Sequence, residues 1–390
     1  MTADYPSGLG KIPRRLIQIV PRFRPDADGL GEFALCLGDA LWRQHAVPSD
    51  FVVWSPPRPV PELPALSGDQ FPHRVYPSLQ RDRERFKAAL RQAGSQSEKP
   101  VALLHYTSYA FSKEGIAWWL PGLLREFLHE GGRIVTFFHE LYAAGKFPNK
   151  TWFSSGLQRH IFREVLALSS AAISSNDLYM RQMAEDNRNE RPLASAGICS
   201  NVGEAQILPP VSGRIPRLAV FGLAPSRRRL YEQHLSVLVQ LARHLHAEEV
   251  ADIGSEGEWP KLREEISARL GEAGVRFKVH GPLPATEVGD LLSHSLAGAV
   301  NYSSGMHLKS GIVGAYQAYG LPVILFRPVA DRESSAKPDP TYLTPQAVLA
   351  QHAGMEQMLN AAGRAGYEFY REHRSYDAIL RQVLPWLQFS

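Results

Sequence analysis

Short apolar runs alternate with longer segments of helical periodicity along most of this chain, and this alternation restricts the fold more than any other feature. The alternation is typical of βαβ units, in which helices join parallel strands. Two series of strands are expected, at residues 16–20, 51–54, 101–105, 134–139 and 171–174, and then at 218–221, 275–279, 297–301 and 323–326. We therefore expect an α/β protein with two doubly wound, Rossmann-like domains that face a central cleft.

The boundary between these domains is expected in a segment without periodicity. Residues 202–216 hold three prolines and lack an apolar pattern, which is typical of a linker. The sequence predicts one domain at residues 1–205, a second at 206–375 and a C-terminal helix at 376–390 that packs back toward the first domain. A chain of 390 residues is long enough for each domain to bury its own core.

The charge balance argues against a nucleic-acid partner. The chain has 43 Lys and Arg against 39 Asp and Glu, and it has no basic arm. Cys36 and Cys199 are the only cysteines, and neither has a metal-ligand partner at short spacing, so neither a disulfide framework nor a metal site is expected. The first 20 residues lack a signal-peptide core, and no apolar run reaches ~18 residues. We expect a cytoplasmic protein, and a peripheral membrane contact stays open.

Two turns in the first half stand where α/β proteins bind ligands. Gly29 and Gly31 precede a helical segment, so their backbone amides could approach an anion. The same pattern is typical of a plain turn that caps a helix, and it lacks the third glycine of a dinucleotide fingerprint. His139 and Glu140 follow a strand, where an imidazole could orient a hydroxyl or accept a proton. A core-edge histidine bonded to a carbonyl is the alternative.

Basic residues follow the first strand of the second series. Arg227 and Arg228 come soon after residues 218–221, and an arginine fork matches the oxygens of a phosphate group. Neighbouring arginines cannot all face one ligand, so at least one of them is expected to be a solvent charge. The sequence leaves open which one that is.

The turn after residues 297–301 has the composition of an anion site. Lys309, Ser310 and Gly311 open a helical segment that Gly320 closes. A lysine, a hydroxyl and the free amides of a helix start together suit a phosphate group. A serine N-cap beside a solvated lysine would give the same sequence without any ligand.

Taken together, these segments resemble the retaining glycosyltransferases of the GT-B fold, in particular the family-4 type. Residues 315–324, AYQAYGLPVI, look like the family's helix that ends in Gly-x-Pro-Val, and residues 280–284, HGPLP, are similar to the turn before its donor loop. Residues 29–41 resemble the loop and helix that approach the donor diphosphate. His139 and Glu140 fall where such enzymes often carry a histidine and an acid.

This resemblance implies transfer of a sugar from a nucleotide diphosphate donor of the UDP or GDP class, with retention and without a metal ion. Residues 206–375 would bind the nucleotide sugar, and residues 1–205 would bind a glycan, a lipid-linked sugar or a metabolite. Segments 56–77 and 141–152 would determine acceptor specificity. The implied donor-binding residues are Gly29, Gly31, Arg227, Arg228, Lys309, Ser310 and Gly311. The implied catalytic residues are His139, Glu140 and His307.

The chain departs from the family at two positions where the family carries glutamates. Counting back from Gly320 places His307 and Ala315 there. In the family, the first glutamate lies near the reaction centre and the second contacts the donor ribose, so His307 would replace the first. A non-catalytic partner or nucleotide-sugar sensor with the same fold stays open. A sugar-nucleotide epimerase stays open too, although it needs paired carboxylates that the sequence does not reveal.

Overall fold

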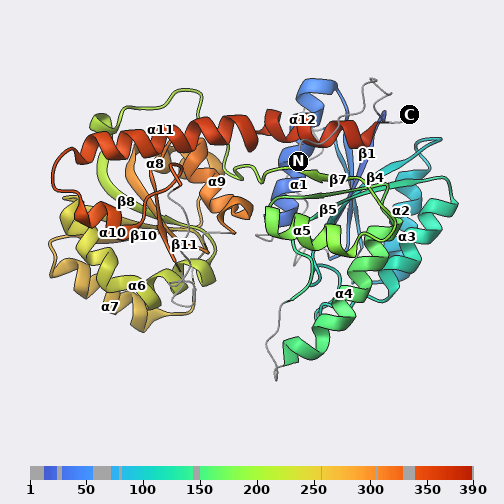
Figure 1. The fold of residues 1–390 in the computed structure, drawn as a ribbon, viewed down its shortest axis with the longest axis horizontal. Helices are drawn as coiled ribbons and strands as arrows, with labels where there is room; N and C mark the ends of the chain where they lie inside the picture. Colours follow the sequence, from blue (N-terminus) through green and yellow to red (C-terminus); the bar gives the residue numbers. More distant parts are fainter. Residues whose placement is uncertain are drawn as a thin grey trace. The chain divides into compact units, whose positions relative to one another are not determined.

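The fold was analysed in a computed structural model that describes residues 13–23, 29–55, 72–78, 81–143, 150–255, 257–303, 306–327 and 339–388. Much of the two segments expected to determine acceptor specificity lies outside these residues. The chain divides into two compact units (Figure 1). Unit 1 comprises Met1–Gly197 and Tyr376–Ser390, and unit 2 comprises Ile198–Ser375. The C-terminal segment thus belongs to unit 1.

Unit 1 is built on a seven-stranded, all-parallel sheet in the order β3-β2-β1-β4-β5-β6-β7. Its strands are β1 (Leu16–Val20), β2 (Ser49–Val53), β3 (Arg74–Pro77), β4 (Val101–Tyr106), β5 (Arg133–Phe138), β6 (Ala171–Ser174) and β7 (Leu193–Ser195). Its helices are α1 (Gly29–His45), α2 (Arg83–Gly94), α3 (Trp119–His129), α4 (Lys150–Leu168), α5 (Asp177–Asp186) and α12 (Tyr376–Leu387).

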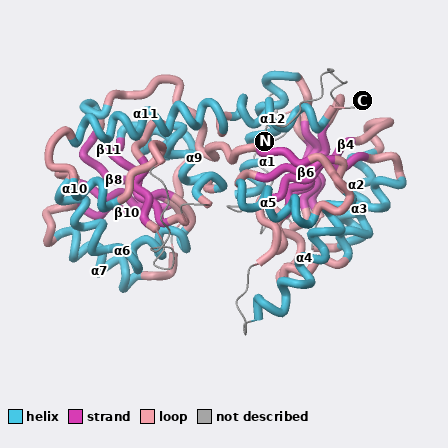
Figure 2. Tube along the Cα trace, viewed as in Figure 1, coloured by secondary structure: helices cyan, strands magenta, loops and turns pink. Residues whose placement is uncertain are grey.

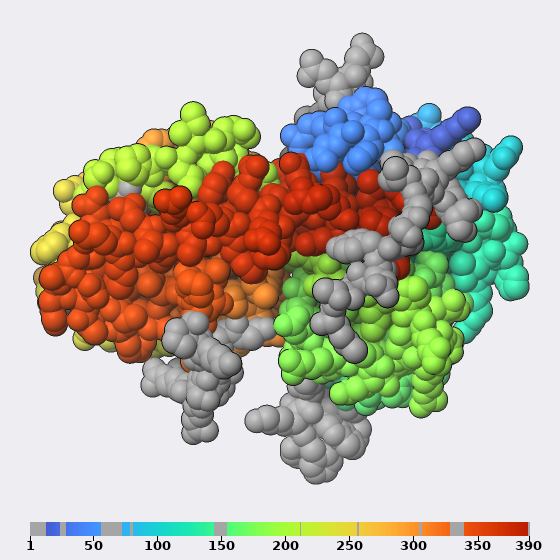
Figure 3. All heavy atoms as spheres, turned by 45° about the horizontal axis from the view of Figure 1, so that its top comes forward, coloured from blue at the N-terminus to red at the C-terminus, as the bar shows by residue number. Residues whose placement is uncertain are grey.

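Helices cover both faces of this sheet. Apolar side chains of α2, α3, α4 and α5 pack with Ile17, Ile19, Ala102 and Leu104 on one face. The other face lies against α1, which in turn packs beside α12 (Figure 3). Because both faces are covered, β1 and β4 are buried along their whole length and β5 along all but its first residue, which explains their near-continuous apolar runs.

Unit 2 is built on a five-stranded, all-parallel sheet in the order β10-β9-β8-β11-β12. Its strands are β8 (Ile215–Phe221), β9 (Glu249–Ile253), β10 (Arg276–Gly281), β11 (Ser295–Asn301) and β12 (Val323–Phe326). Its helices are α6 (Ala224–His244), α7 (Pro260–Gly271), α8 (Ala285–His294), α9 (Gly311–Ala318), α10 (Pro345–Ala350) and α11 (Met355–His373), with short 3-10 turns η1 (Val211–Gly213) and η2 (His307–Lys309).

The second sheet is also sandwiched between helices (Figure 2). Helices α6, α7 and α10 pack on the face that carries Leu218, Val220 and Val250. Helices α8 and α9 pack on the opposite face, which carries Ala219 and Ala251. Consecutive strand residues therefore point to opposite cores, as the two-residue period of a strand requires.

The sequence predicted all strands except β3, β7 and β9. The segment that forms β9 contains Glu249 and Asp252, which are unusual in a central strand. Both carboxylates are buried and paired: Glu249 bonds Arg217 and Arg276, and Asp252 bonds Arg227. Paired charges made a buried strand look polar, so its pattern was missed.

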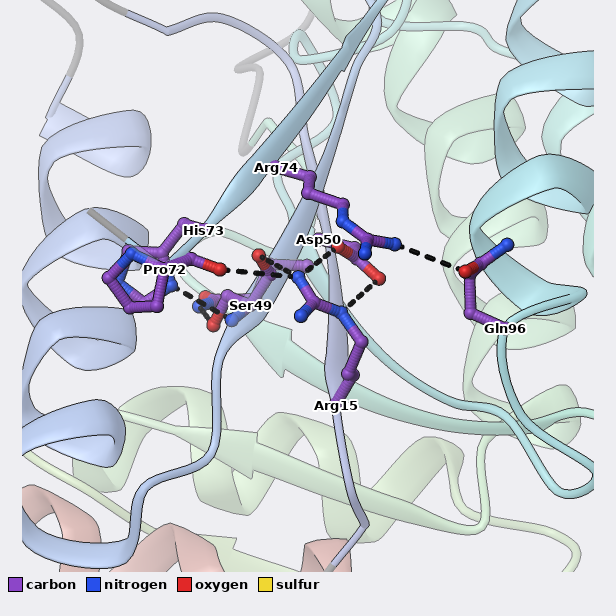
Figure 4. Close-up of polar contacts among 8 residues, drawn as sticks. Arg15, Ser49, Asp50, Pro72, His73, Arg74 and Gln96 are labelled. Atoms are coloured by element: carbon purple, nitrogen blue, oxygen red, sulfur yellow. Dashed lines mark hydrogen bonds and ion pairs between the residues drawn. The ribbon is translucent and has the colours of Figure 1, made fainter. Parts of the chain in front are cut away.

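A polar cluster fixes the amino-terminal ends of β1, β2 and β3 (Figure 4). Arg15, just before β1, donates two hydrogen bonds to the Asp50 carboxylate, from Nε at 2.9 Å and from Nη2 at 2.6 Å. The backbone N–H of Ser49 donates to Nδ1 of His73 at 2.9 Å. These bonds set the register at one end of the sheet and leave its carboxyl edge for the loops that can bind a ligand.

Candidate functional site

Each sheet has one place where the strand order reverses. In unit 1 the reversal lies between β1 and β4, and in unit 2 it lies between β8 and β11. Ligands of open α/β sheets bind beside the carboxyl ends of strands at such a point, because the loops leave there in opposite directions. The residues at each of these two edges are therefore the candidates for ligand binding in their own unit.

Helix α9 begins at the edge of unit 2, directly beyond β11 and η2. Ser310 is its N-cap, as its Oγ accepts a hydrogen bond from the Val313 N–H at 3.3 Å. The Ser310 carbonyl accepts a bond from Nη2 of Arg374 at 2.6 Å. Lys309 is the last residue of η2 and half-buried, immediately before the cap. The helix start therefore combines a fixed cap, first-turn amides and an adjacent cation, which suits an anion.

Tyr316 anchors α9 to both strands at the reversal point. Its hydroxyl accepts a hydrogen bond from the Phe221 N–H at 2.9 Å and lies 3.1 Å from the Ala219 carbonyl and 3.2 Å from the Ala299 carbonyl. Burial raises the pKa of this phenol above its ordinary range. A neutral hydroxyl thus satisfies the backbone groups where β8 and β11 part, and it fixes the helix start relative to the sheet.

His307 lies in η2 and is buried beside an acid. Its Nε2 is 3.5 Å from Oδ2 of Asp339, and its ring packs edge-on to Tyr342 at 5.1 Å between centroids. Burial raises the pKa of Asp339, but the hydrogen bonds from His307 and Thr341 outweigh it, so the net pKa lies below the ordinary value. Asp339 is therefore a carboxylate that orients the imidazole.

The two predicted arginines, Arg227 and Arg228, lie in different environments. Arg227 is 1% exposed, and its guanidinium bonds the Asp252 carboxylate and the carbonyls of Gly222 and Ser255. Arg228 is exposed and pairs with Glu232, one helical turn further on, at 2.7 Å. Arg227 is thus part of the core of unit 2, where its charge already balances that of Asp252.

At the edge of unit 1, the first turns of α1, which hold the predicted glycines, contact His139 through Phe33. Helix α1 begins at Gly29, and a Cβ on Gly31 would lie 2.5 Å from the Arg22 carbonyl oxygen, so close packing of the turn requires glycine there. Phe33, two residues further, packs edge-on to His139 with 5.2 Å between ring centroids. The start of α1 and the end of β5 therefore form one edge, and Glu140 is exposed beside it.

His139 is buried and belongs to a line of polar groups that the sequence analysis did not identify. Its Nε2 is 3.2 Å from Nδ1 of His105, and Nε2 of His105 is 3.0 Å from Oε1 of Gln18. Burial lowers the pKa of His105 to about 3, so this imidazole is neutral at pH 7. The sequence did contain a signal for this line of polar groups: Gln18 in LIQIV and His105 in VALLHY are polar residues inside buried, largely apolar strands.

Neither a metal centre nor a membrane span is found in the part of the chain that the structure describes. No three His, Cys, Asp or Glu side chains of the described ranges gather closely enough to hold an ion. Among the same residues, no helix combines the length and apolar character needed to cross a bilayer.

Comparison of the fold finds similar proteins where comparison with family models and curated sequences finds none. No family model matches the chain, and no curated protein matches it significantly. An alpha-glucosyltransferase in complex with UDP and a 13-mer DNA containing a HMU base superimposes with a TM-score of 0.58 and 10% identity, over 96% of this chain and 99% of that one. A glycosyltransferase from Rickettsia africae gives 0.56 and 11%, over 96% and 97%.

A structure with a different proposed chemistry shares the same architecture. A putative UDP-N-acetylglucosamine 2-epimerase from Listeria monocytogenes superimposes with a TM-score of 0.50 and 12% identity, over 91% of this chain and 92% of that one. At such identities the likeness shows the fold alone. The chain thus has two Rossmann-like parallel-sheet units, the layout of GT-B glycosyltransferase structures, and its reaction has to be argued from its own residues.

Proposed function

We propose that the protein transfers a sugar from a nucleotide diphosphate donor, of the UDP or GDP class, to a carbohydrate or lipid-linked acceptor. The observation that carries this proposal is the start of α9 beside the strand reversal of unit 2. There a capped helix N-terminus, anchored through Tyr316 and Arg374, stands next to Lys309 and the His307–Asp339 pair. In this proposal, unit 2 binds the donor and unit 1 binds the acceptor.

The chemistry follows from where charge develops. Cleavage of the bond between the anomeric carbon and the diphosphate leaves negative charge on the phosphate oxygens. Amides of Gly311 and Ile312, together with Lys309, would stabilise that charge without reorganisation, which lowers the barrier to transfer. Retention on the donor's own face requires no enzyme nucleophile, and these cationic and dipolar groups would act without a metal ion.

The remaining predicted site residues have different roles in this proposal. His139, at the edge of unit 1, would orient a sugar or acceptor hydroxyl, and Glu140 lies exposed next to it. His307 would face the reacting sugar with Asp339 as its orienting partner. Arg227 has no part at the diphosphate in this proposal, because removing it from Asp252 would leave a carboxylate buried without its partner.

One observation favours a second candidate, a nucleotide-sugar sensor or non-catalytic partner. Ala315 stands where the resembling family has the glutamate that contacts the donor ribose, and it is fully buried among apolar residues of unit 2. His307 stands at the position of the other glutamate, which in that family lies near the reaction centre. A chain that kept the anion site but lost both carboxylates would bind a nucleotide without turning it over.

Thermal unfolding in the presence of nucleotides separates these candidates, because a ligand that binds only the folded state stabilises it. UDP, GDP, ADP, dTDP and their sugars would be compared on the whole chain, followed by an assay for release of the nucleoside diphosphate from any sugar that binds. The proposal expects a shift with one nucleotide class and slow donor hydrolysis. A shift without any hydrolysis or transfer supports the sensor, and no shift with any of them contradicts both.

A further inference from the structure

A continuous line of hydrogen-bonded polar groups crosses the core of unit 1. It runs from Asp39 Oδ1 to His73 Nε2 at 3.1 Å, and the Ser49 N–H reaches His73 Nδ1 at 2.9 Å. Ser49 Oγ is 2.9 Å from Gln18 Nε2, and the line continues through His105 to His139. We call these six residues, Asp39, His73, Ser49, Gln18, His105 and His139, the polar array.

The polar array starts at the surface and ends at the candidate site. The Asp39 side chain is 45% exposed, whereas Ser49, Gln18 and His105 are completely buried. The strand registers put Gln18, Ser49 and His105 on the same face of the sheet. Polar groups in such a layer are costly unless each is satisfied, and apolar side chains would fill it at lower cost. The array therefore needs a reason beyond packing.

The order of donors and acceptors in the array determines where its protons are. The Ser49 N–H can only donate, so Nδ1 of His73 accepts and Nε2 of His73 carries the proton toward Asp39. The Gln18 amide directs its nitrogen to Ser49 Oγ and its oxygen to His105. His105 therefore carries its proton on Nε2 and accepts at Nδ1, and His139 must supply the proton of that last bond from its own Nε2.

The surrounding groups keep the two imidazoles in this arrangement. Phe137 stacks on His139 at 4.5 Å between centroids, and Phe33 packs edge-on to both His105 and His139. At the other end, a Cβ on Gly38 of α1 would lie 3.0 Å from both Gln18 Nε2 and Ser49 Oγ, so the helix backbone closes directly over the array. Neither ring can turn over without displacing these neighbours.

We propose that His105 is a positioning residue that, through Gln18, holds the proton of His139 on Nε2, so that Nδ1 of His139 is the nitrogen that accepts a hydrogen bond. If the proposed transfer reaction holds, on which this last step rests, the bond comes from a hydroxyl of the acceptor or the sugar. Protonation of His139 at Nδ1 would leave the bond to His105 intact. The array thus fixes which ring nitrogen does the chemistry.

Nitrogen-15 NMR of histidine-labelled protein tests the proton placement directly, because the two neutral tautomers of imidazole have different nitrogen shifts. The His139 signals are assigned by their loss in His139→Asn. The proposal expects a wild-type His139 that is protonated at Nε2 and not at Nδ1. In Gln18→Met, His105 loses its acceptor and can turn its own proton toward His139, so the Nδ1-protonated form of His139 should appear.

Thr136→Val is the matched control. Thr136 is a fully buried polar residue of β5, like the array members, but its Oγ1 bonds Ser169 Oγ at 2.6 Å on the other face of the sheet. It should leave the His139 tautomer unchanged while losing a comparable buried hydrogen bond. A wild-type His139 protonated at Nδ1, or a tautomer that is the same in wild type and Gln18→Met, overturns the proposal.

Kinetics distinguish a failure of this inference from a failure of the proposed function. If a nucleotide sugar is turned over, Gln18→Met should lower kcat by about 10- to 100-fold and change nucleoside diphosphate affinity less than about twofold, since the diphosphate is assigned to unit 2. If the protein turns over a nucleotide sugar but the His139 tautomer does not respond to Gln18→Met, the proposed role of the array is overturned and the transfer reaction stands. A tautomer that responds, in a protein that neither binds nor uses any nucleotide sugar, supports the array and overturns the transfer reaction.

Discussion

The two units share the strand order around their reversal points, yet they bring different chemistry to those points. In unit 1 the edge is reached by imidazoles that are linked through an amide and a hydroxyl, and His105 among them is neutral at pH 7. In unit 2 charged groups surround the edge: the Arg227–Asp252 ion pair, the Asp339 carboxylate beside His307, and Lys309 at a helix start. The same backbone layout thus serves proton placement in one unit and charge stabilisation in the other, which shows why fold alone does not assign a reaction.

The largest expected effect comes from opening the buried ion pair of unit 2. Arg227→Met removes the ion-pair partner of Asp252 and leaves a buried carboxylate that keeps the Tyr231 hydroxyl, at 2.9 Å, as a hydrogen-bond donor. We expect a loss of about 3 to 5 kcal/mol in the unfolding free energy of unit 2, measured by urea denaturation. Adding Asp252→Asn should restore part of this loss. If Arg227→Met alone is as stable as the wild type, the Arg227–Asp252 pair does not stabilise the loops that follow β8 and β9.

The buried, neutral His105 of unit 1 predicts a different response, a loss of stability in acid. The pKa of His105 is about 3 in the folded protein against 6.5 in the unfolded chain, so below pH 6.5 the unfolded state takes up a proton that the folded state excludes. The contribution of the neutral His105 to stability is complete well above pH 6.5 and is lost as the pH falls through 6.5 toward 3, by on the order of 5 kcal/mol in all.

This acid response can be isolated with His105→Phe, which has no group to titrate. Urea denaturation of both proteins at pH 7, 6 and 5 should give unfolding free energies whose difference moves in favour of the variant by ~2 kcal/mol over this range. The carboxylates common to both proteins cancel in this comparison. Parallel pH curves for the two proteins would contradict a neutral, buried His105.

The contrast between the units also explains what the sequence could reveal. Apolar runs and the Ser310 to Gly320 pattern predicted the sheet layers and the α9 helix, because these depend on local periodicity and caps. The array could not be predicted, because Gln18, Ser49 and His105 are distant in sequence and meet only through strand register. Asp339 was missed for the same reason, as its partner His307 lies on another loop. Polar residues inside apolar strands were the available clue.

At the charged edge, removal of Lys309 tests the assignment to a diphosphate. Lys309→Ala should weaken nucleotide diphosphate binding by about 10- to 100-fold, which corresponds to the ~1.5 to 3 kcal/mol of a charge-assisted hydrogen bond. Isothermal titration of the ligand that emerges from the thermal panel gives the affinity. Lys261→Ala, an exposed lysine of α7 in the same unit, should bind as the wild type does. Equal affinities for both variants would remove Lys309 from the phosphate role.

Ser310 gives the smallest effect and the finest distinction, since its hydroxyl caps α9 and was also predicted to bind the donor. If Oγ serves only the Val313 N–H, Ser310→Ala should cost about 1 kcal/mol of stability, and Ser310→Gly only a few tenths, because glycine is itself a tolerated N-cap. Donor affinity would then be retained in Ser310→Gly. If the hydroxyl also bonds a phosphate oxygen, both variants should lose affinity equally, by about three- to tenfold, whatever their stability. Measuring stability and affinity on the same two proteins therefore tells whether the charged edge of unit 2 binds its anion with backbone amides and Lys309 alone or with a side-chain hydroxyl as well.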